Sequence, residues 1–287
     1  AEDISGMPGL AAPGEEGGMG FDYRLAMGVP DFWIKILKER PDEDWPLGEM
    51  WYELTNRRVD EKTIGYAESH DQALVGDKTL MLRLTGSVLY DHMHVGSKNM
   101  AVDRGMALHK LVRFITLATA GNGYLNFMGN EFGHPDWIDF PREGNGWSYD
   151  HARRQWHLMD NPDLKYAYLA RFDHHMIALA RTFRLLDSLG PRSLLIHSDH
   201  KILAFERGGL LFVFNFHPTC SHKDYPIEVG PGEYEMIMDS DAMEYGGHGR
   251  LRQGQRHFTA PALSLYLPTR TALVLAPVDK GIDTEEP

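Results

Sequence analysis

The strongest hydrophobic pattern in the chain predicts a helix over residues 103 to 119. Its apolar positions recur at the i, i+3, i+4 and i+7 spacing that places side chains on one helical face: Leu108, Leu111, Val112 and Ile115. Two glycines follow shortly after residue 119 and end the pattern. We therefore expect a well-formed helix with one apolar face.

Short apolar runs on both sides of this helix predict strands that end in polar or glycine-rich loops. The strands are expected at 21–27, 62–68 and 123–128. Further helices are expected at 31–38, shortly after Pro46, and over 148–186. Strand, loop and helix thus alternate three times, as in parallel α/β units whose active face lies at the carboxyl ends of the strands.

The pattern changes to short β-type runs after Gly190-Pro191. These runs are separated by turn residues and cover 194–197, 201–206, 210–216, 234–238, 263–267 and 272–275. We expect an α/β domain over residues 1–188 and an all-β sandwich with its own core over 189–280, which folds independently. Residues 281–287 are predicted to be a frayed tail.

The composition limits the classes of partner. With 43% hydrophobic and 11% aromatic residues the chain has enough apolar surface for real cores, while 41 acidic against 29 basic residues give a net charge of -12. This charge argues against nucleic acid and against an anionic membrane surface. Cys220 is the only cysteine, which favours a reducing compartment such as the cytoplasm. There is no apolar run of about 20 residues and no signal-peptide pattern.

Few side chains suggest chemistry by their position alone. Glu2 precedes a glycine-rich stretch over residues 4–20, where most carboxylates merely solvate a loop. His70 and Asp71 follow the strand predicted over 62–68, so they would lie at the mouth of the sheet, although a structural His–Asp pair is the alternative. Ser69 next to them does not make a hydrolase triad, because triad members converge from separate segments.

Metal and nucleotide sites are not predicted, but an aromatic cluster is notable. The paired histidines lack the spacing of a metal site, and the glycine-rich stretches lack the ending of a phosphate loop. Aromatic residues interleave with polar ones between positions 130 and 149: Phe132, Trp137, Phe140, Trp147 and Tyr149. This mixture suits stacking on sugar rings and equally suits packing in a core.

Three long segments carry a family resemblance. They are residues 1–8 (AEDISGMP), 67–72 (AESHDQ) and 123–135 (GYLNFMGNEFGHP), supported by 20–27 and 239–248. In sequence and in order they closely resemble signature segments of the glycogen and starch branching enzymes of the alpha-amylase superfamily. The resemblance runs from residue 1 to about residue 277. It implies an α/β fold: the carboxy-terminal part of a (β/α)8 TIM barrel, strands five to eight, followed by an all-β sandwich.

The resemblance also implies roles for four residues. Glu2 matches the general acid/base and Asp71 the carboxylate that stabilises the transition state, so both are expected to be catalytic. His70 matches a substrate-binding residue, and Asp22 is expected to bind substrate as well. The family's nucleophile, an Asp on the fourth strand, has no counterpart here. Since the chain also begins without an initiator Met, we expect the amino-terminal half to be missing and the fragment alone to be inactive.

The activity that this family implies is 1,4-alpha-glucan branching. Such an enzyme cleaves α-1,4 bonds with retention and transfers the chain to a 6-hydroxyl of glycogen, amylose or amylopectin, without metal or organic cofactor. The expected partners are an alpha-glucan polysaccharide and the missing amino-terminal half. An alpha-amylase-type hydrolase and a non-catalytic glucan-binding protein are the alternatives, and the sequence upstream of Ala1 would discriminate between them.

Overall fold

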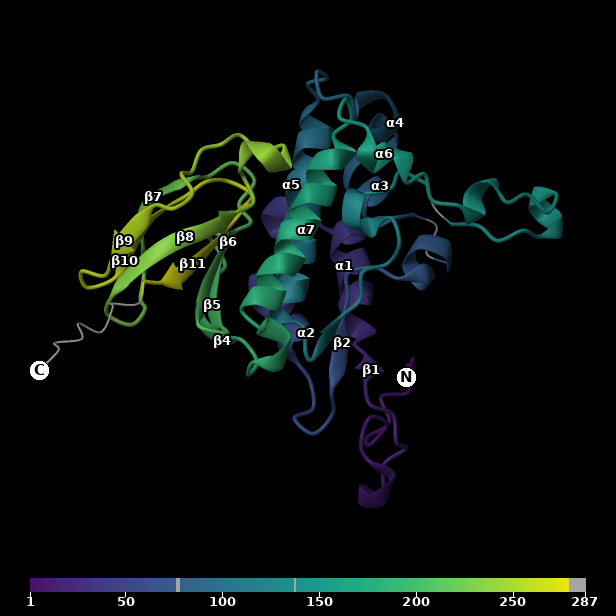
Figure 1. The fold of residues 1–287 in the computed structure, drawn as a ribbon, viewed down its shortest axis with the longest axis horizontal. Helices are drawn as coiled ribbons and strands as arrows, with labels where there is room; N and C mark the ends of the chain where they lie inside the picture. Colours follow the sequence, from purple (N-terminus) through teal and green to yellow (C-terminus); the bar gives the residue numbers. More distant parts are fainter. Residues whose placement is uncertain (76–77, 137, 279–287) are drawn as a thin grey trace, which may run out of the picture.

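The computed structural model describes residues 1–75, 78–136 and 138–278, which form an α/β part followed by a β part (Figure 1). The α/β part contains a three-stranded parallel sheet of β1 (Arg24–Leu25), β2 (Thr63–Gly65) and β3 (Gly123–Tyr124) in that order. The Ala1 amino group donates to the Tyr23 carbonyl at 2.5 Å, and the Leu25 N–H donates to the Ala1 carbonyl at 2.9 Å. Ala1 therefore lies beside β1 in parallel orientation.

The sheet strands are shorter than predicted. Only two or three residues of each predicted strand join the ladder, although the flanking Tyr66 and Ala67 are buried like strand residues. Burial of apolar side chains shows that a segment enters the core, but it does not show where backbone pairing stops. The parallel arrangement that the alternation of elements predicted is confirmed.

Seven α-helices occur in the described residues. They are α1 (Gly28–Glu39), α2 (Leu47–Thr55), α3 (Leu80–Thr85), α4 (Leu89–His92), α5 (Met100–Thr119), α6 (His157–Asp160) and α7 (Tyr166–Thr182). The short helices α3 and α4 were not predicted. The single helix expected over 148–186 is wrong, because residues 148–165 are irregular apart from two short helical pieces, Asp150–Ala152 and α6, and α7 begins only at Tyr166. Pro162 explains part of this, since proline and the residue before it disfavour a continuing helix.

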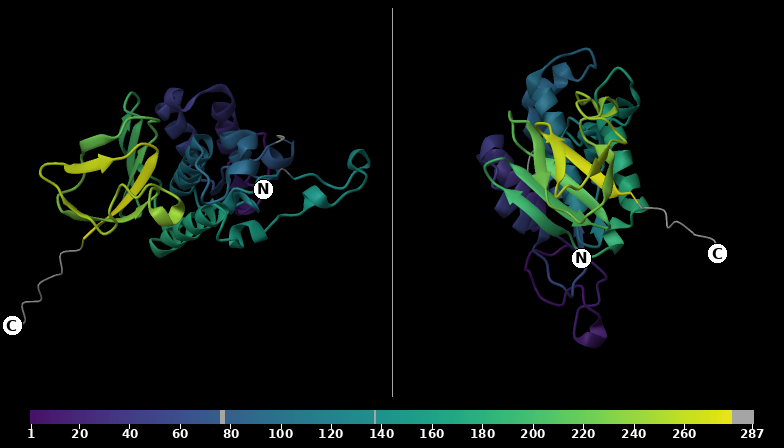
Figure 2. Two further views of the ribbon diagram at one scale, coloured as in Figure 1. Left: turned by 90° about the horizontal axis from the view of Figure 1, so that it is seen from above. Right: turned by 90° about the vertical axis from the view of Figure 1, so that its left-hand side faces the viewer.

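Helix α5 is confirmed at the predicted place but is more deeply buried than expected. It begins after Asn99, whose side chain accepts hydrogen bonds from the Ala101 and Val102 N–H groups. Polar residues such as Lys110 and Arg113 are buried along with the apolar face. The reason is that α5 lies beside α7 in the middle of the molecule, with the parallel sheet on one side and the β part on the other (Figures 1 and 2).

The β part is the predicted sandwich. Its large sheet has the order β4-β5-β6-β11-β8-β9, formed by β4 (Arg192–His197), β5 (Ile202–Arg207), β6 (Leu210–Asn215), β11 (Thr271–Pro277), β8 (Glu233–Asp239) and β9 (Arg256–Phe258). The small sheet pairs β7 (His222–Ile227) with β10 (Leu263–Leu267). Side chains such as Val213, Leu265 and Leu273 fill a core between the two sheets. Strands β7 and β9 were not predicted, because their charged residues hide the alternation.

The other face of the large sheet packs against the helices. Phe205, Phe212 and Phe214 stack along this face, and Phe114 of α5 meets two of these rings with centroids 5.9 Å apart. Apolar side chains of α1, α2, α5 and α7 belong to the same buried cluster. The predicted boundary near residue 188 lies between helix and strand, and the two parts share this cluster. Independent folding of the sandwich, which also has a core of its own, stays a prediction.

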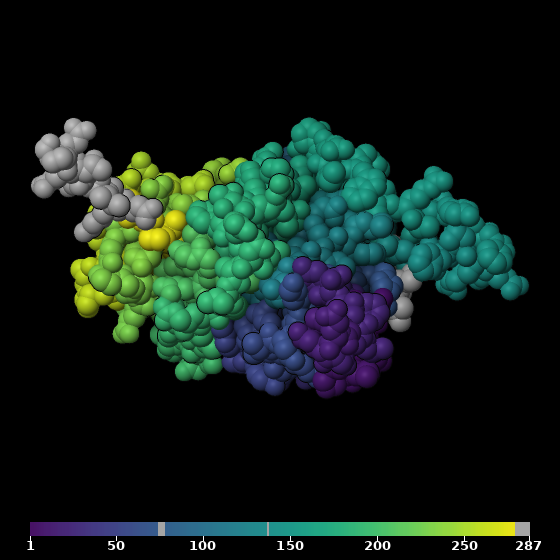
Figure 3. Space-filling view, turned by 60° about the horizontal axis from the view of Figure 1, so that its bottom comes forward, coloured from purple at the N-terminus to yellow at the C-terminus, as the bar shows by residue number. Residues whose placement is uncertain are grey.

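Residues 138–155 form an extension, here called the arm, that stands clear of the α/β part (Figures 1 and 3). It connects the loop after β3 to the segment before α7. No helix among the described residues is long and apolar enough to cross a membrane. Trp137 and the predicted tail over 281–287 lie outside the described residues.

Candidate active site

Three of the four predicted site residues meet at one place. His70 Nε2 lies 3.6 Å from Glu2 Oε1 and 3.2 Å from Asp71 Oδ1. Glu2 follows the residue that pairs with β1, and His70 and Asp71 follow β2, so all three extend from the carboxyl side of parallel elements. This convergence of segments far apart in sequence is what a catalytic constellation requires.

A buried ionic network holds the segment that carries Glu2. Glu61 accepts hydrogen bonds from Arg24 and Arg58, each at 3.0 Å, and from the Ala11 N–H at 3.2 Å. Arg24 also donates to the Met7 carbonyl at 2.9 Å. Burial opposes ionisation of Glu61, but these hydrogen bonds prevail and lower its pKa to about 2. The glycine-rich loop after Glu2 is therefore tied to β1 and to the turn before β2.

The segment that carries His70 and Asp71 is held mainly by Ser69 and Gln72. The Gln72 side-chain oxygen accepts from the Ser69 N–H at 2.8 Å and from the Ser69 hydroxyl at 2.9 Å. The Asp71 N–H in turn donates to the Ser69 hydroxyl oxygen at 3.3 Å. A π-helical turn over Asp71–Val75 follows. Such turns are frequent at functional sites, and here one begins at a proposed catalytic carboxylate.

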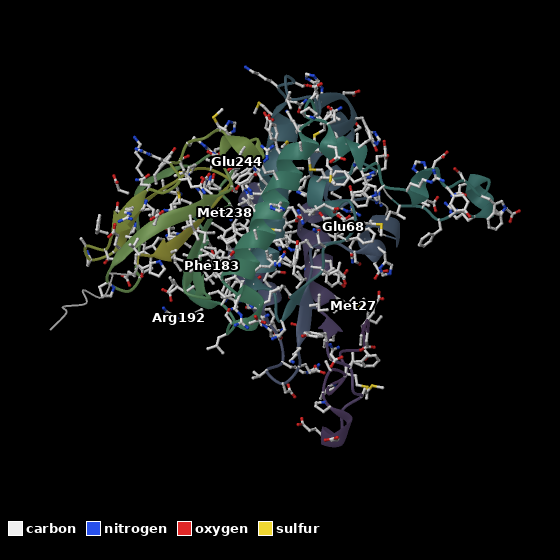
Figure 4. All side chains as sticks on the ribbon, in the orientation of Figure 1. Met27, Glu68, Phe183, Arg192, Met238 and Glu244 are labelled. Atoms are coloured by element: carbon white, nitrogen blue, oxygen red, sulfur yellow. The ribbon has the colours of Figure 1, made fainter. Side chains whose placement is uncertain are left out.

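Glu68 fixes the base of the same segment. Its buried carboxylate accepts a hydrogen bond from the Leu80 N–H at the start of α3. This bond connects the residue before the segment that carries His70 and Asp71 with the helix that follows this segment. Burial raises the pKa of Glu68 to about 7, although the Leu80 hydrogen bond and the charges of Arg154 and other arginines oppose the shift. Glu68 lies inside the helical part of the molecule (Figure 4).

Tyr66 lies underneath the cluster. Its side chain is 1% exposed. Burial raises the pKa of its hydroxyl, and the charges of Asp71, Asp31 and Glu2 add to this effect. Tyr66 and Glu68 were missed by sequence reasoning, which weighed only the exposed end of the strand. The sequence carried only a weak signal for Glu68, because this residue stands at the end of the apolar run and polar residues follow it directly.

Asp22 is not part of the cluster. It lies two residues before β1, at the amino end of that strand, and it is exposed. In a parallel sheet the amino and carboxyl ends of strands lie on opposite edges, so Asp22 faces the edge away from the carboxyl side where the other three meet. The substrate-binding role expected for Asp22 stays a prediction.

Glu2, His70 and Asp71 could also hold a cation. Each offers one ligand atom, and these atoms lie within 4.8 Å of one another. Oxygen and imidazole ligands at this spacing suit a divalent ion, but the residues are largely exposed, and such groups commonly occur without one. The expectation that the chemistry needs no metal stays a prediction.

A groove with a volume of about 590 Å³ lies beside this cluster and does not include its three residues. It runs between β1, β2 and the helices α1, α2 and α5, and its lining includes Asp3, Arg24, Arg57, Leu54 and Thr116. The ionisable side chains of this groove, such as Glu61, Arg24 and Arg58, are paired with one another. We assign the candidate site from the meeting of Glu2, His70 and Asp71 at the carboxyl side of the parallel elements.

The fold defines the class of protein. Residues 195–278 match the family model of the alpha amylase C-terminal all-beta domain. An alpha-amylase from H. orenii has a similar structure, with a TM-score of 0.54 at 14% identity over 96% of this chain and 52% of that one. AmyP in complex with maltose gives a TM-score of 0.52 at 13% identity over 90% of this chain and 51% of that one. The fold is that of the carboxy-terminal part of alpha-amylase enzymes.

Curated relatives point to one kind of enzyme within this class. A 1,4-alpha-glucan-branching enzyme of Solanum tuberosum is 53% identical over 263 residues, which are 91% of this chain and 30% of that enzyme. The branching enzyme of Felis catus is 51% identical over 97% of this chain and 41% of its own length. The resemblance to branching enzymes is confirmed, and the chain corresponds to a carboxy-terminal part that spans less than half the length of these relatives.

Proposed function

We propose that this chain forms part of a 1,4-alpha-glucan branching enzyme, in which Glu2 and Asp71 are catalytic and His70 binds substrate. The observation that supports this most directly is the meeting of Glu2, His70 and Asp71 at the carboxyl side of the parallel elements. The names of relatives that are about half identical over nearly the whole chain support the same activity. The proposed substrate is an alpha-glucan polysaccharide.

The chemistry assigns a separate task to each side chain. Glu2 protonates the glycosidic oxygen as the α-1,4 bond breaks, and the sugar passes to a carboxylate nucleophile supplied by the missing amino-terminal half. Glu2, now ionised, removes the proton from an acceptor 6-hydroxyl, which attacks the sugar and forms an α-1,6 branch. Asp71 and His70 bind ring hydroxyls and stabilise the positive charge of the transition state.

The chain by itself is proposed to be inactive, because a retaining transfer needs the second carboxylate to trap the sugar. Incubation of the purified chain with amylose should leave iodine staining unchanged. Branching by the purified chain would contradict this proposal. It would point to Asp71 as the nucleophile, since its carboxylate lies within 4.8 Å of Glu2.

The transferase activity is tested in the full-length protein, in which this chain is joined to its amino-terminal half. We expect amylose to gain α-1,6 linkages with few new reducing ends, because the acceptor is a sugar hydroxyl and not water. Reducing ends that rise in step with bond cleavage would instead identify an amylase-type hydrolase. Binding of amylose with neither product would identify a non-catalytic glucan-binding protein.

The compartment is proposed to be reducing, such as the cytoplasm. Cys220, the only cysteine of the chain, is free in the structure, so no internal disulfide contributes to stability. Retention of full stability in a reducing buffer would agree with this proposal. A loss of stability on reduction would indicate a disulfide to another chain or to the missing half.

A further inference from the structure

Four histidines gather at one end of the sandwich, away from the candidate active site, and are here called the histidine cluster. His197 ends β4, His200 lies in the turn before β5, His217 follows β6 and His222 begins β7. The His197 and His200 rings stack with centroids 3.9 Å apart, and the His222 ring lies 4.9 Å from His200 and 6.4 Å from His217. The fold therefore brings four titratable rings together from separate segments.

Backbone N–H groups hold two of these rings in the neutral form. His217 Nδ1 accepts hydrogen bonds from the Cys220 N–H at 2.8 Å and from the Thr219 N–H at 3.1 Å. His197 Nδ1 accepts a hydrogen bond from the His200 N–H at 3.3 Å. A nitrogen that accepts carries a lone pair, so the proton of each neutral ring lies on Nε2. Protonation of Nδ1 turns the acceptor into a donor and breaks these bonds.

The bonds to His217 close the crossover by which the chain passes from the large sheet to the small sheet, between β6 and β7. The buried Asn215 side chain accepts from the His217 N–H at 2.8 Å and donates to the Cys220 carbonyl at 3.0 Å. The Phe216 N–H donates to the Lys201 carbonyl at 2.9 Å. The closed shape of the crossover therefore depends on His217 remaining an acceptor.

The surroundings of the cluster oppose a positive charge. Burial lowers the pKa of His217, and the charges of Lys201, Arg270 and His200 lower it further. Burial and the neighbouring histidines also lower the pKa of His222, although a hydrogen bond with the His200 backbone opposes this shift. The buried Nε2 of His222 has no hydrogen-bond partner among the described residues. Proton uptake therefore favours an open crossover, in which water solvates the rings.

Lys201 and Arg270 are fixed beside the cluster, because both hold the sandwich to the α/β part. Lys201 Nζ donates to the Trp45 carbonyl at 3.1 Å, and Arg270 donates to the Asp42 carboxylate at 2.9 Å. Asp42 is buried and also pairs with Arg104 of α5, so two arginines share this carboxylate. A proton on the cluster therefore meets two positive charges that are held in place.

Other polar groups near the cluster compensate a positive charge poorly. The Tyr225 hydroxyl lies 3.1 Å from His200 Nδ1 and is neutral, and burial raises its pKa. Asp199 lies in the same turn as His200, and Lys223 and Asp224 follow His222 in β7. All three are exposed to solvent, where water and salt screen their charges.

We propose that the histidine cluster is an acid-sensitive clasp, which holds the crossover between the two sheets closed while its rings are neutral and opens it when they take up protons. The stabilisation is complete above about pH 6.5, the ordinary pKa of histidine. It is lost as the pH falls below this value, because the open form binds protons more readily than the closed form. The clasp does not depend on Glu2, His70 or Asp71 and goes beyond the branching activity.

Amide hydrogen exchange of the 287-residue chain tests the clasp. Mass spectrometry follows a fragment over residues 214–222, with rates corrected for the intrinsic exchange at each pH and compared with a fragment from α5. Protection of the 214–222 fragment should fall between pH 7.5 and 5.5. The expected change below pH 6.5 is up to about tenfold per pH unit for each proton that only the open form binds.

Variants of His217 separate its role as an acceptor from its charge. In His217→Asn the side-chain oxygen replaces Nδ1 as acceptor and takes up no proton, so protection should persist at pH 5.5. His217→Ala should lose protection at both pH values, and His222→Phe should make the pH dependence shallower because one titrating ring is gone. His94→Asn is the matched control. The exposed His94 also accepts a backbone N–H, from Gly96 at 3.0 Å, but lies outside the cluster, so its loss should change nothing in this fragment.

Protection that stays constant from pH 7.5 to 5.5, or acid sensitivity that survives in His217→Asn, would overturn the clasp. Protection at pH 7.5 that zinc chloride raises and a chelator removes would overturn it in favour of a metal site. The structure does not favour such a site, since the four histidines do not bring three ligand atoms within 4.8 Å of one another. None of these outcomes bears on the branching test, so the two proposals fail separately.

Discussion

At the residue scale, the proposed division of labour between Glu2 and Asp71 makes a direct prediction. In the full-length protein, Glu2→Gln should nearly abolish transfer, because an amide keeps the shape of the side chain but cannot donate the proton. Asp71→Asn should slow turnover by about 10²- to 10³-fold, through lost electrostatic stabilisation of about 2.7 to 4 kcal/mol. Asp199→Asn is the control, since Asp199 is exposed in the turn between β4 and β5. Near-normal turnover of both active-site variants would exclude these roles.

Glu68 gives a prediction about pH and stability. Its carboxyl group has an ordinary pKa of 4.5 and a folded-state pKa of about 7, so between these values the folded state binds the proton more tightly than the unfolded state. The free energy of unfolding therefore falls as pH rises from 4.5 to 7. In the Glu68→Gln variant the side chain is neutral at every pH, so this pH dependence of the free energy of unfolding is removed. Between pH 4.5 and 7 the free energy of unfolding of the variant should therefore rise relative to that of wild type, by on the order of 3 kcal/mol.

Urea unfolding at pH 4.5, 6 and 7.5 measures the Glu68 effect. Glu244→Gln is the matched control, because Glu244 is an exposed glutamate in the β part (Figure 4) and should show no such trend. A constant difference between wild type and Glu68→Gln at all three pH values would contradict the prediction.

At the element scale, one arginine of the sandwich caps the central helix. Arg207, at the end of β5, is 3% exposed and donates to three carbonyls at the carboxyl end of α5: Ala118 at 3.0 Å, Ala120 at 2.5 Å and Gly121 at 2.9 Å. A positive charge at a helix carboxyl end is favourable, and it satisfies carbonyls that lack helical partners. This side chain therefore adds a buried polar link to the apolar core that the two parts share.

Replacement of Arg207 by Leu should lower the free energy of unfolding by about 3 kcal/mol, because several buried carbonyls lose a charged donor. Arg192→Leu is the matched control. Arg192 pairs with Glu206 at the edge of β4, but its side chain is 69% exposed, so its loss should cost less than about 1 kcal/mol. Equal effects of the two changes in chemical denaturation would rule out the capping role.

At the scale of the whole molecule, the shared core predicts how the sandwich behaves alone. Residues 189–278 contain a complete core between their two sheets, so they should keep β structure. Separation from the helices exposes Phe205, Phe212 and Phe214 on the outer face of the large sheet. Exposed apolar patches of this kind cause association. We expect the isolated sandwich to bind a hydrophobic dye and to self-associate, and a monomeric, dye-free sandwich would contradict this.

The sequence alone was sufficient to predict an element or a family resemblance where one local signal dominates. The periodicity of α5, the β-type runs after residue 190 and the long motifs around Glu2, His70 and Asp71 are local patterns, and the structure or the comparisons confirm the elements and the resemblance that they predicted. Errors in the predicted elements were also local, since the turn at Asn161-Pro162 was overlooked within a stretch that was predicted as one long helix.

Only the tertiary structure decided which surfaces meet. The burial of most of α5, the sharing of one core by the two parts and the meeting of Glu2 with His70 depend on packing between distant segments. The same is true of Glu68, whose partner at Leu80 lies beyond the loop that it closes. Hydrophobic pattern is a property of neighbours in sequence, whereas burial, ion pairing and pKa are set by neighbours in space.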